Sequence, residues 1–169
     1  LQEVPNRLVV IGGGYIGLEM GSVYAKLGSD VSVVEFLPRL VPDLDADVGK
    51  ALTRRLKKIG IDLYLEHRAE SFTAGDPGVV TARGPKDEEL QLEADRVLVT
   101  VGRVPNSEGL GLEAAGVETD GKGFIVVNDR QQTSAAGIYA IGDVAGGALL
   151  AHKAYQEAKV AAEVIAGEP

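Results

Sequence analysis

The chain has 169 residues, of which 45% are hydrophobic and 25% charged, and its formal net charge is −8. This acidic balance argues against a nucleic-acid partner, whose phosphates are neutralised by Lys and Arg, and no stretch approaches the roughly 18 apolar residues of a membrane span. The absence of cysteine excludes a disulfide, a thiolate metal site and a cysteine nucleophile within the chain. We therefore expect no nucleic-acid or membrane partner, and a location in the cytoplasm or, in a eukaryote, the mitochondrial matrix.

The first part of the chain predicts a βαβ unit. Residues 8–11 are a continuous apolar run that ends at a glycine, which is typical of a buried parallel strand. Residues 15–27 have the spacing of a helix that ends at Gly28, and residues 31–35 form the second strand. The apolar face of the helix is predicted to consist of Ile16, Met20, Val23, Tyr24 and Leu27.

The next elements continue this pattern and then change it. A second helix is predicted to begin near Asp45 and end at Gly60, followed by a third strand over residues 61–65. Turn clusters rich in Gly and Pro divide residues 70–93, which favours an antiparallel meander, and residues 97–101 return as a buried strand. The predicted fold class is α/β, with a Rossmann-like parallel sheet and an antiparallel meander.

A domain boundary is predicted near Pro105. Residues 1–104 would form one compact domain, and residues 105–169 would form only part of a second one, with few elements to pack against. The elements expected there are a short helix over 112–115, strands over 124–127 and 138–141, and a helix over 152–166 that ends at Gly167.

Residues 12–17 carry a G-x-G-x-x-G pattern between a predicted strand and a predicted helix. In such a turn Gly12 permits the tight bend, Gly14 lets backbone amides approach a phosphate, and Gly17 lets the helix pack closely on the strands. The helix N-terminus adds N–H groups and a positive dipole end. The pattern predicts a dinucleotide pyrophosphate site; the alternative is a glycine-rich turn without a ligand.

An acidic residue ends the second predicted strand, near the spacing of roughly 20 residues that this motif requires. The carboxylate of Glu35 could accept hydrogen bonds from ribose hydroxyls and repel a 2′-phosphate, which favours NAD over NADP. Arg39 lies nearby in the sequence and could weaken this discrimination. The alternative for Glu35 is a surface residue at the end of a strand.

A second signature lies in residues 133–143, and this segment resembles the flavin-binding segment of the pyridine nucleotide–disulfide oxidoreductase family. Residues 149–154, with Glu157 beyond them, resemble the dihydrolipoamide dehydrogenases within that family. Residues 102–106 and 34–36 strengthen the resemblance, which covers essentially the whole chain. It implies an NAD-binding domain over residues 1–104 and an incomplete C-terminal part of an FAD-binding domain beyond.

The resemblance also implies the cofactor contacts, and it implies no catalytic residue and no metal ligand in this chain. Ala69, at the end of the third predicted strand, and Gly102 would complete the NAD site. The NAD contacts implied are Gly12, Gly13, Gly14, Tyr15, Ile16, Gly17, Leu18, Glu19, Glu35, Ala69 and Gly102. The FAD contacts implied are Asp143, which would bond the ribityl chain, and Leu149, Leu150, Ala151 and His152, which would run beside the isoalloxazine.

The activity that the resemblance implies is oxidation of dihydrolipoyl groups by NAD⁺ through a disulfide and FAD. The partner would be the lipoyl-bearing acyltransferase of a 2-oxo acid dehydrogenase complex, and the parent enzyme would be a homodimer. The family's redox-active Cys pair and its first FAD glycine motif have no counterpart here, so we expect a central fragment that is inactive alone. The alternatives are another enzyme of the family, such as an NADH oxidase or a mercuric or glutathione reductase, or a stand-alone dinucleotide-binding module.

Overall fold

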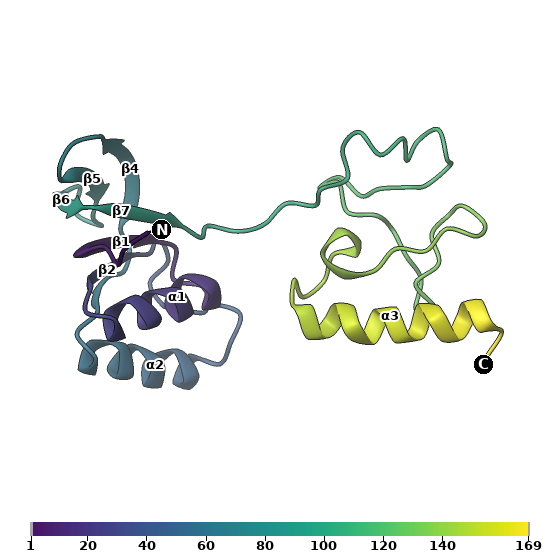
Figure 1. Cartoon of the computed structure of the whole chain (residues 1–169), viewed down its shortest axis with the longest axis horizontal. Coiled ribbons are helices and arrows are strands. Elements are labelled where there is room, and N and C mark those ends of the chain that lie inside the picture. The colour runs from purple at the N-terminus through teal and green to yellow at the C-terminus, as the bar shows by residue number, and fades with distance from the viewer. Residues whose placement is uncertain (1, 169) are drawn as a thin grey trace. The chain divides into compact units, whose positions relative to one another are not determined.

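The computed structural model describes residues 2–168 and divides the chain into two compact units, each with a core of its own (Figure 1). The first unit ends at Gly102 and the second begins at Arg103. Within residues 2–168, no helix combines the length and the apolar character needed to cross a membrane.

The first unit is built on a four-stranded parallel sheet in the order β3-β2-β1-β7. Its central strands β1 and β2 are the most buried, and Val10 and Val33 have no exposed surface, as expected of parallel strands that are covered on both faces. The strands are β1 (Arg7–Ile11), β2 (Asp30–Val34), β3 (Asp62–Tyr64) and β7 (Arg96–Val99). The predicted Rossmann-like parallel sheet is confirmed.

Two layers cover the parallel sheet, the helices α1 (Tyr15–Lys26) and α2 (Ala46–Lys58) on one face and the remaining strands on the other (Figure 1). Because successive side chains of a strand point to opposite faces, Val10 packs in the cluster beneath the helices while Val9 packs against the other layer. The sheet therefore has a separate apolar core on each side.

The second layer of this unit is the antiparallel meander that the turn clusters predict. It consists of β4 (Arg68–Thr73), β5 (Gly78–Arg83) and β6 (Glu89–Ala94), paired in that order. Alternate residues of β5 are buried, among them Val80 and Ala82, and they pack on Val9 and Val34 of the parallel sheet. The fold class predicted from sequence is therefore observed in full for this unit.

Helix α1 buries a different face from the predicted one. Its buried residues are Gly17, Leu18 and Gly21, whereas Met20 and Val23 are 40% and 49% exposed. The reason is close packing: a Cβ at Gly17 would lie 2.5 Å from Oγ1 of Thr100 and 3.0 Å from Cγ1 of Val10, so glycine brings the helix backbone onto the sheet. Hydrophobic periodicity alone could not identify a face made of glycines.

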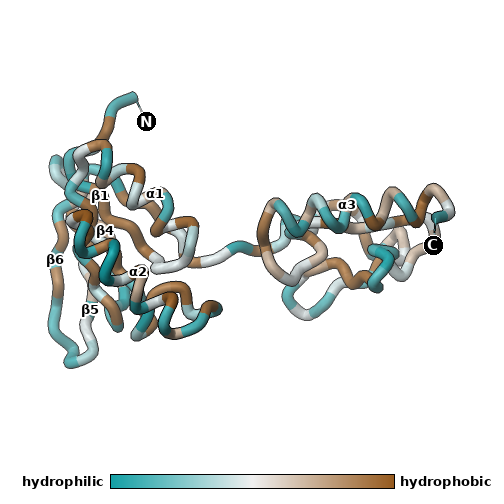
Figure 2. The backbone as a smooth tube through the Cα atoms, turned by 90° about the horizontal axis from the view of Figure 1, so that it is seen from below, coloured by the Kyte–Doolittle hydropathy of each residue, from teal (hydrophilic) through white to brown (hydrophobic). Residues whose placement is uncertain are grey.

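The second unit contains one long helix, α3 (Ala151–Ala166), and a short 3₁₀ turn, η1 (Gly142–Ala145). Hydrophilic and hydrophobic residues alternate along α3 (Figure 2), and Gly167 ends it with a φ of 81°, as the sequence predicts. A small core of Val117, Ile125 and Ala140 holds the rest of the unit together.

Three of the predicted elements of this unit are wrong. Residues 112–115 form a turn instead of a helix, and Gly111 and Gly116 on either side have left-handed backbones (φ 70° and 74°) that interrupt helical geometry. The strands expected over 124–127 and 138–141 are absent among the described residues, which show isolated bridges at Ile125 and Tyr139. A strand requires a continuous ladder with a neighbour, and each of these segments forms a β-bridge at one position.

Candidate functional site

The glycine turn between β1 and α1 is the first candidate site. Gly12 has a φ of +109°, and a Cβ there would lie 2.5 Å from the Thr100 carbonyl oxygen. Its N–H donates to the Val34 carbonyl at 2.9 Å, which ties the turn to β2. At Gly17 a Cβ would lie 2.6 Å from the Gly12 carbonyl oxygen. Both positions therefore require glycine for the fold alone.

Gly14 differs from these two glycines. It is the N-cap of α1, with an extended backbone (φ −78°, ψ 172°) and no side-chain cap, and no atom lies within 4 Å of where its Cβ would be. A helix N-terminus without a side-chain cap can satisfy an anion with its backbone N–H groups. The turn is thus packed at Gly12 and Gly17 and open at Gly14.

The structure brings Glu35 to this turn from the end of β2. Glu35 is buried, at 8% exposure. Its Oε2 accepts a hydrogen bond from the Gly13 N–H at 2.5 Å, and its Oε1 accepts one from the Leu37 N–H at 2.6 Å. Such charge-assisted bonds fix the orientation of the carboxylate. Arg39 is exposed and donates to the Pro42 carbonyl.

The other predicted residues of the first unit lie at different depths. Tyr15 is 43% exposed, Ile16 is half-buried and Glu19 is exposed, whereas Leu18 is buried in the core at 3% exposure. The placement of Ala69 at the end of the third strand is wrong: it lies in β4 and pairs with Ala82 of β5. Gly102, with a φ of +132°, is the last residue of the unit.

In the second unit, the η1 turn holds Asp143 beside the start of α3. Gly142 has a φ of +75°, and its N–H donates to Oε2 of Glu157 at 2.7 Å. Lys153 contacts the other Glu157 oxygen at 2.5 Å. Asp143 forms an ion pair with Arg103 at 2.8 Å. Helix α3 therefore fixes the backbone from which the Asp143 carboxylate projects.

The remaining predicted residues of this unit are consecutive. Leu149 and Leu150 are half-buried, Leu150 being the N-cap of α3, and Ala151 and His152 are exposed in its first turn. The sequence-predicted residues of the second unit thus gather around η1 and the N-terminus of α3.

Three residues that contact the glycine turn were missed at the level of sequence. The Thr100 hydroxyl donates to the carbonyls of Ile11 and Gly12, at 3.0 and 3.3 Å, and Leu40 and Val41 contact Gly13. Thr100 could have been found because it follows β7, the strand beside β1, and the carboxyl ends of parallel neighbours meet at one edge. Leu40 and Val41 carry no such signal.

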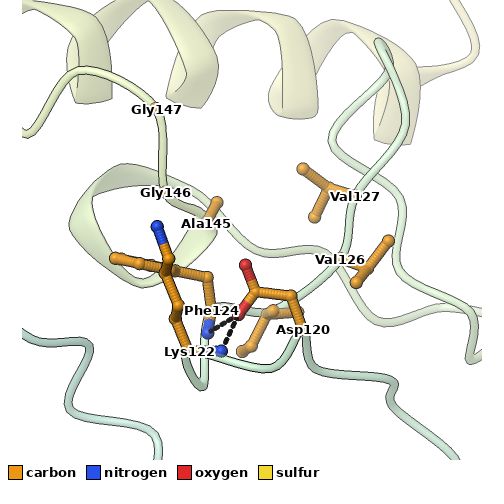
Figure 3. Close-up of a pocket in the computed structure, with 9 residues that line it drawn as sticks. Asp120, Lys122, Phe124, Val126, Val127, Ala145, Gly146 and Gly147 are labelled. Atoms are coloured by element: carbon orange, nitrogen blue, oxygen red, sulfur yellow. Dashed lines mark hydrogen bonds between the residues drawn. The ribbon is translucent and has the colours of Figure 1, made fainter.

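A hollow of about 440 Å³ lies elsewhere in the second unit (Figure 3). The hollow is lined by Asp120, Lys122, residues 124–127 and residues 145–147. None of the sequence-predicted site residues lines it. The Asp120 carboxylate accepts from the backbone N–H groups of Lys122 and Phe124 at 2.8 and 2.9 Å, so its role there is to close a turn. Among residues 2–168, no group of three or more His, Cys, Asp or Glu side chains gathers to hold a metal ion.

The fold and the glycine turn are those of a Rossmann-like α/β protein. This architecture is typical of dinucleotide-binding domains. A family model described as pyridine nucleotide-disulphide oxidoreductase matches residues 1–158. The chain belongs to this family.

The chain is similar in sequence to dihydrolipoyl dehydrogenases. The chain is 44% identical to dihydrolipoyl dehydrogenase 3 of Haloarcula marismortui, over 98% of this chain and 36% of the relative. It is 48% identical to the mitochondrial dihydrolipoyl dehydrogenase 1 of Arabidopsis thaliana, over 99% of this chain and 34% of the relative. The chain thus spans little more than a third of the length of these relatives.

Among solved structures, the HOCl-induced flavoprotein disulfide reductase RclA of Escherichia coli matches with a TM-score of 0.89 and 31% identity, over 100% of this chain and 38% of that one. LpdA of Mycobacterium tuberculosis matches with a TM-score of 0.88 and 34% identity, over 100% of this chain and 36% of that one. Identity above 30% over the whole chain agrees with the family assignment.

Proposed function

We propose that this chain is the NAD-binding portion, with part of the FAD-binding portion, of a flavin-dependent dihydrolipoamide dehydrogenase. The observation that carries the proposal is the buried Glu35 carboxylate bonded to the Gly13 N–H, beside an open Gly14. An acid at the end of β2 in contact with a glycine turn after β1 is the arrangement that reads a dinucleotide's ribose and pyrophosphate together.

The residues present fit NAD. The open backbone at Gly14 and the N-terminus of α1 would hold the pyrophosphate. An ionised carboxylate has about four acceptor positions, and the two bonds to Gly13 and Leu37 leave acceptor capacity on Glu35 for ribose hydroxyls. NAD, when bound, supplies the hydride acceptor. Leu18 is buried in the core, so it would contact NAD through its backbone. Ala69, in β4, would contribute to the wall of the site.

Glu35 also supports a preference for NAD over NADP. A buried carboxylate repels the 2′-phosphate of NADP, and losing hydration makes that repulsion stronger. Arg39 would be the cation to offset it, but its guanidinium donates to the Pro42 carbonyl of its own loop. The charge nearest the ribose position is therefore negative.

The second unit would supply part of the FAD site. Asp143, held at η1 by the Gly142 to Glu157 hydrogen bond, would accept a hydrogen bond from a ribityl hydroxyl. Leu149, Leu150, Ala151 and His152 would lie beside the isoalloxazine, with the N-terminus of α3 favouring negative charge there. FAD, when bound, supplies the electron carrier between the dithiol and the nicotinamide.

The activity of the whole protein would be NAD-dependent oxidation of dihydrolipoyl groups on the acyltransferase of a 2-oxo acid dehydrogenase complex, by a homodimer. The 44–48% identity to dihydrolipoyl dehydrogenases supports this choice. The second candidate is another flavoprotein disulfide reductase, which the structural match to RclA favours; its identity of 31% is lower.

Titration of NADH and NADPH into the 169-residue chain tests the proposal. We expect NADH to bind, NADPH to bind more weakly, and the chain to show no dihydrolipoamide oxidation. Glu35→Gln should weaken NADH binding by roughly 1.5–3 kcal/mol, the value of a charge-assisted hydrogen bond, whereas Glu113→Gln, at an exposed acid of the second unit, should leave it unchanged. Equal affinity for the two nucleotides, or turnover by the chain alone, would contradict the proposal.

A further inference from the structure

The segment from Leu37 to Val41, here called the strap, follows Glu35 and lies against the glycine turn. Leu40 is fully buried (0% exposed), and its Cδ2 lies 2.7 Å from where a Cβ of Gly13 would be. The N–H of Val41 donates to the Gly13 carbonyl at 3.0 Å. The strap therefore contacts the middle glycine of the turn by packing and by a hydrogen bond.

The strap is itself held in an unusual conformation. Val41 has a φ of +43°, a left-handed backbone that is rare for a β-branched residue and persists only where the surroundings fix it. Its side chain is buried at 7% exposure. On the other side of the strap, Gly49 of α2 packs closely, since a Cβ there would lie 3.2 Å from the Leu40 carbonyl oxygen. Helix α2 thus supports the strap from outside the turn.

The bond from Val41 sets the direction of the next amide. A trans peptide is planar, so the carbonyl of Gly13 and the N–H of Gly14 belong to one rigid plane and point in opposite directions. Because the Gly13 carbonyl is directed to Val41, the Gly14 N–H is directed away from the strap. The Gly13 N–H, bonded to Glu35 at 2.5 Å, fixes the preceding peptide.

We propose that Leu40 and Val41 are positioning residues that hold the Gly13–Gly14 peptide with its free edge toward the bound anion. Neither residue touches the nucleotide; both act through Gly13. The identity of the anion as a dinucleotide rests on the proposed function, whereas the restraint on the turn exists in the ligand-free chain.

A matched pair of substitutions tests the positioning role. Leu40 and Leu56 are both fully buried leucines of the same core cluster, at 0% and 2% exposure, but Leu56 lies on α2 and only Leu40 contacts Gly13. Both Leu40→Ala and Leu56→Ala should lower the midpoint of thermal unfolding. Leu40→Ala should raise the Kd for NADH about three- to tenfold, the equivalent of one neutral hydrogen bond, whereas Leu56→Ala should leave it unchanged. Leu40→Met, which conserves volume, should restore the affinity.

Amide hydrogen exchange in the ligand-free chain supplies a second readout. Leu40→Ala should accelerate exchange at the N–H groups of Gly13 and Val41 more than Leu56→Ala does. If Leu40→Ala and Leu56→Ala accelerate amide exchange at Gly13 and Val41 equally, the proposal is overturned, even if NADH binds. It is also overturned if the two variants lose NADH affinity equally. If the wild-type chain binds no NADH, the proposed function fails while the exchange rates still decide the role of the strap. Where Leu40→Ala does not fold, Leu40→Val paired with Leu56→Val makes the same comparison.

Discussion

At the scale of single residues, the glycines of the turn divide into those that the fold needs and one that it does not. Gly12 and Gly17 contact the segment around Thr100, at distances that no Cβ could occupy. Gly14 has a backbone conformation open to any residue and empty space where a side chain would lie. Packing does not require glycine at this position, which agrees with the proposed approach of a ligand.

Alanine substitutions should separate these two kinds of glycine. Gly12→Ala should destabilise the chain strongly, because the left-handed backbone costs about 1–2 kcal/mol and the new Cβ would lie 2.5 Å from the Thr100 carbonyl oxygen. Gly14→Ala should change stability by less than about 1 kcal/mol but weaken NADH binding. Urea unfolding and NADH titration measure the two effects; wild-type NADH affinity in Gly14→Ala would remove Gly14 from the site.

The turn and Glu35 could be predicted because the glycine pattern and the acid follow one another at a fixed spacing along the chain. The structure places Glu35 at the turn, where its carboxylate accepts a hydrogen bond from the Gly13 N–H. Thr100 was missed because its partner Ile11 lies 89 positions away, and Leu40 was missed because a buried leucine has no feature that marks its contact with Gly13. Residues that shape a site through packing leave no pattern of their own.

At the scale of elements, prediction succeeded where each element carries its own boundaries. The strands and helices of the first unit lie between glycines and turn clusters, and the meander follows from the turns near 75–78 and 84–87. In the second unit the apolar runs at 124–127 and 138–141 have the composition of strands but only isolated pairing. Strand formation depends on a neighbour, which a single segment's sequence does not specify.

The junction of the meander with the parallel sheet contains a carboxylate, Asp95, that is paired with Arg7. Asp95, between β6 and β7, accepts hydrogen bonds from the Arg7 backbone N–H at 2.8 Å and from its Nη2 at 2.7 Å. The hydrogen bond from the Arg7 side chain is the main cause that lowers the pKa of Asp95 below its ordinary value of 3.8. The folded state therefore binds this proton more weakly than the unfolded state does.

The stability that Asp95 contributes should be present in full above its ordinary pKa and be lost as the pH falls below it, through the lowered folded value. Asp95→Asn should consequently reduce the acid dependence of the urea midpoint between about pH 5 and about pH 3. Asp62→Asn, at an exposed acid of β3, serves as the control. An acid dependence in Asp95→Asn as steep as that of the wild type would show that other carboxyl groups dominate.

At the scale of the whole molecule, the two units differ in how complete their proposed sites are. The first contains both the turn and the acid of its site, whereas the second offers Asp143 and the start of α3. In the full-length flavoprotein that we propose, Asp143→Ala should weaken FAD retention by about 1–3 kcal/mol, because a ribityl hydroxyl would lose its acceptor. The 169-residue chain should be colourless after purification.

Flavin absorbance before and after dialysis measures this effect. Asp129→Ala, at an exposed acid of the same unit, should retain FAD as the wild type does. Full flavin occupancy in Asp143→Ala after dialysis would remove Asp143 from the flavin site. The ion pair of Asp143 with Arg103 at 2.8 Å is exposed, so its loss should affect stability little.

The two hydrogen bonds that the Glu35 carboxylate accepts from Gly13 and Leu37 have a consequence for redesign of cofactor choice. Exchanging this acid for a cation to accept NADP would also place a group without acceptors against two backbone donors, and so would deform the turn that must hold the pyrophosphate. A variant library that changes position 35 alone should therefore yield poor binders of both nucleotides. A successful switch would keep acceptors for the Gly13 and Leu37 N–H groups and bring a positive charge to the ribose from a second position.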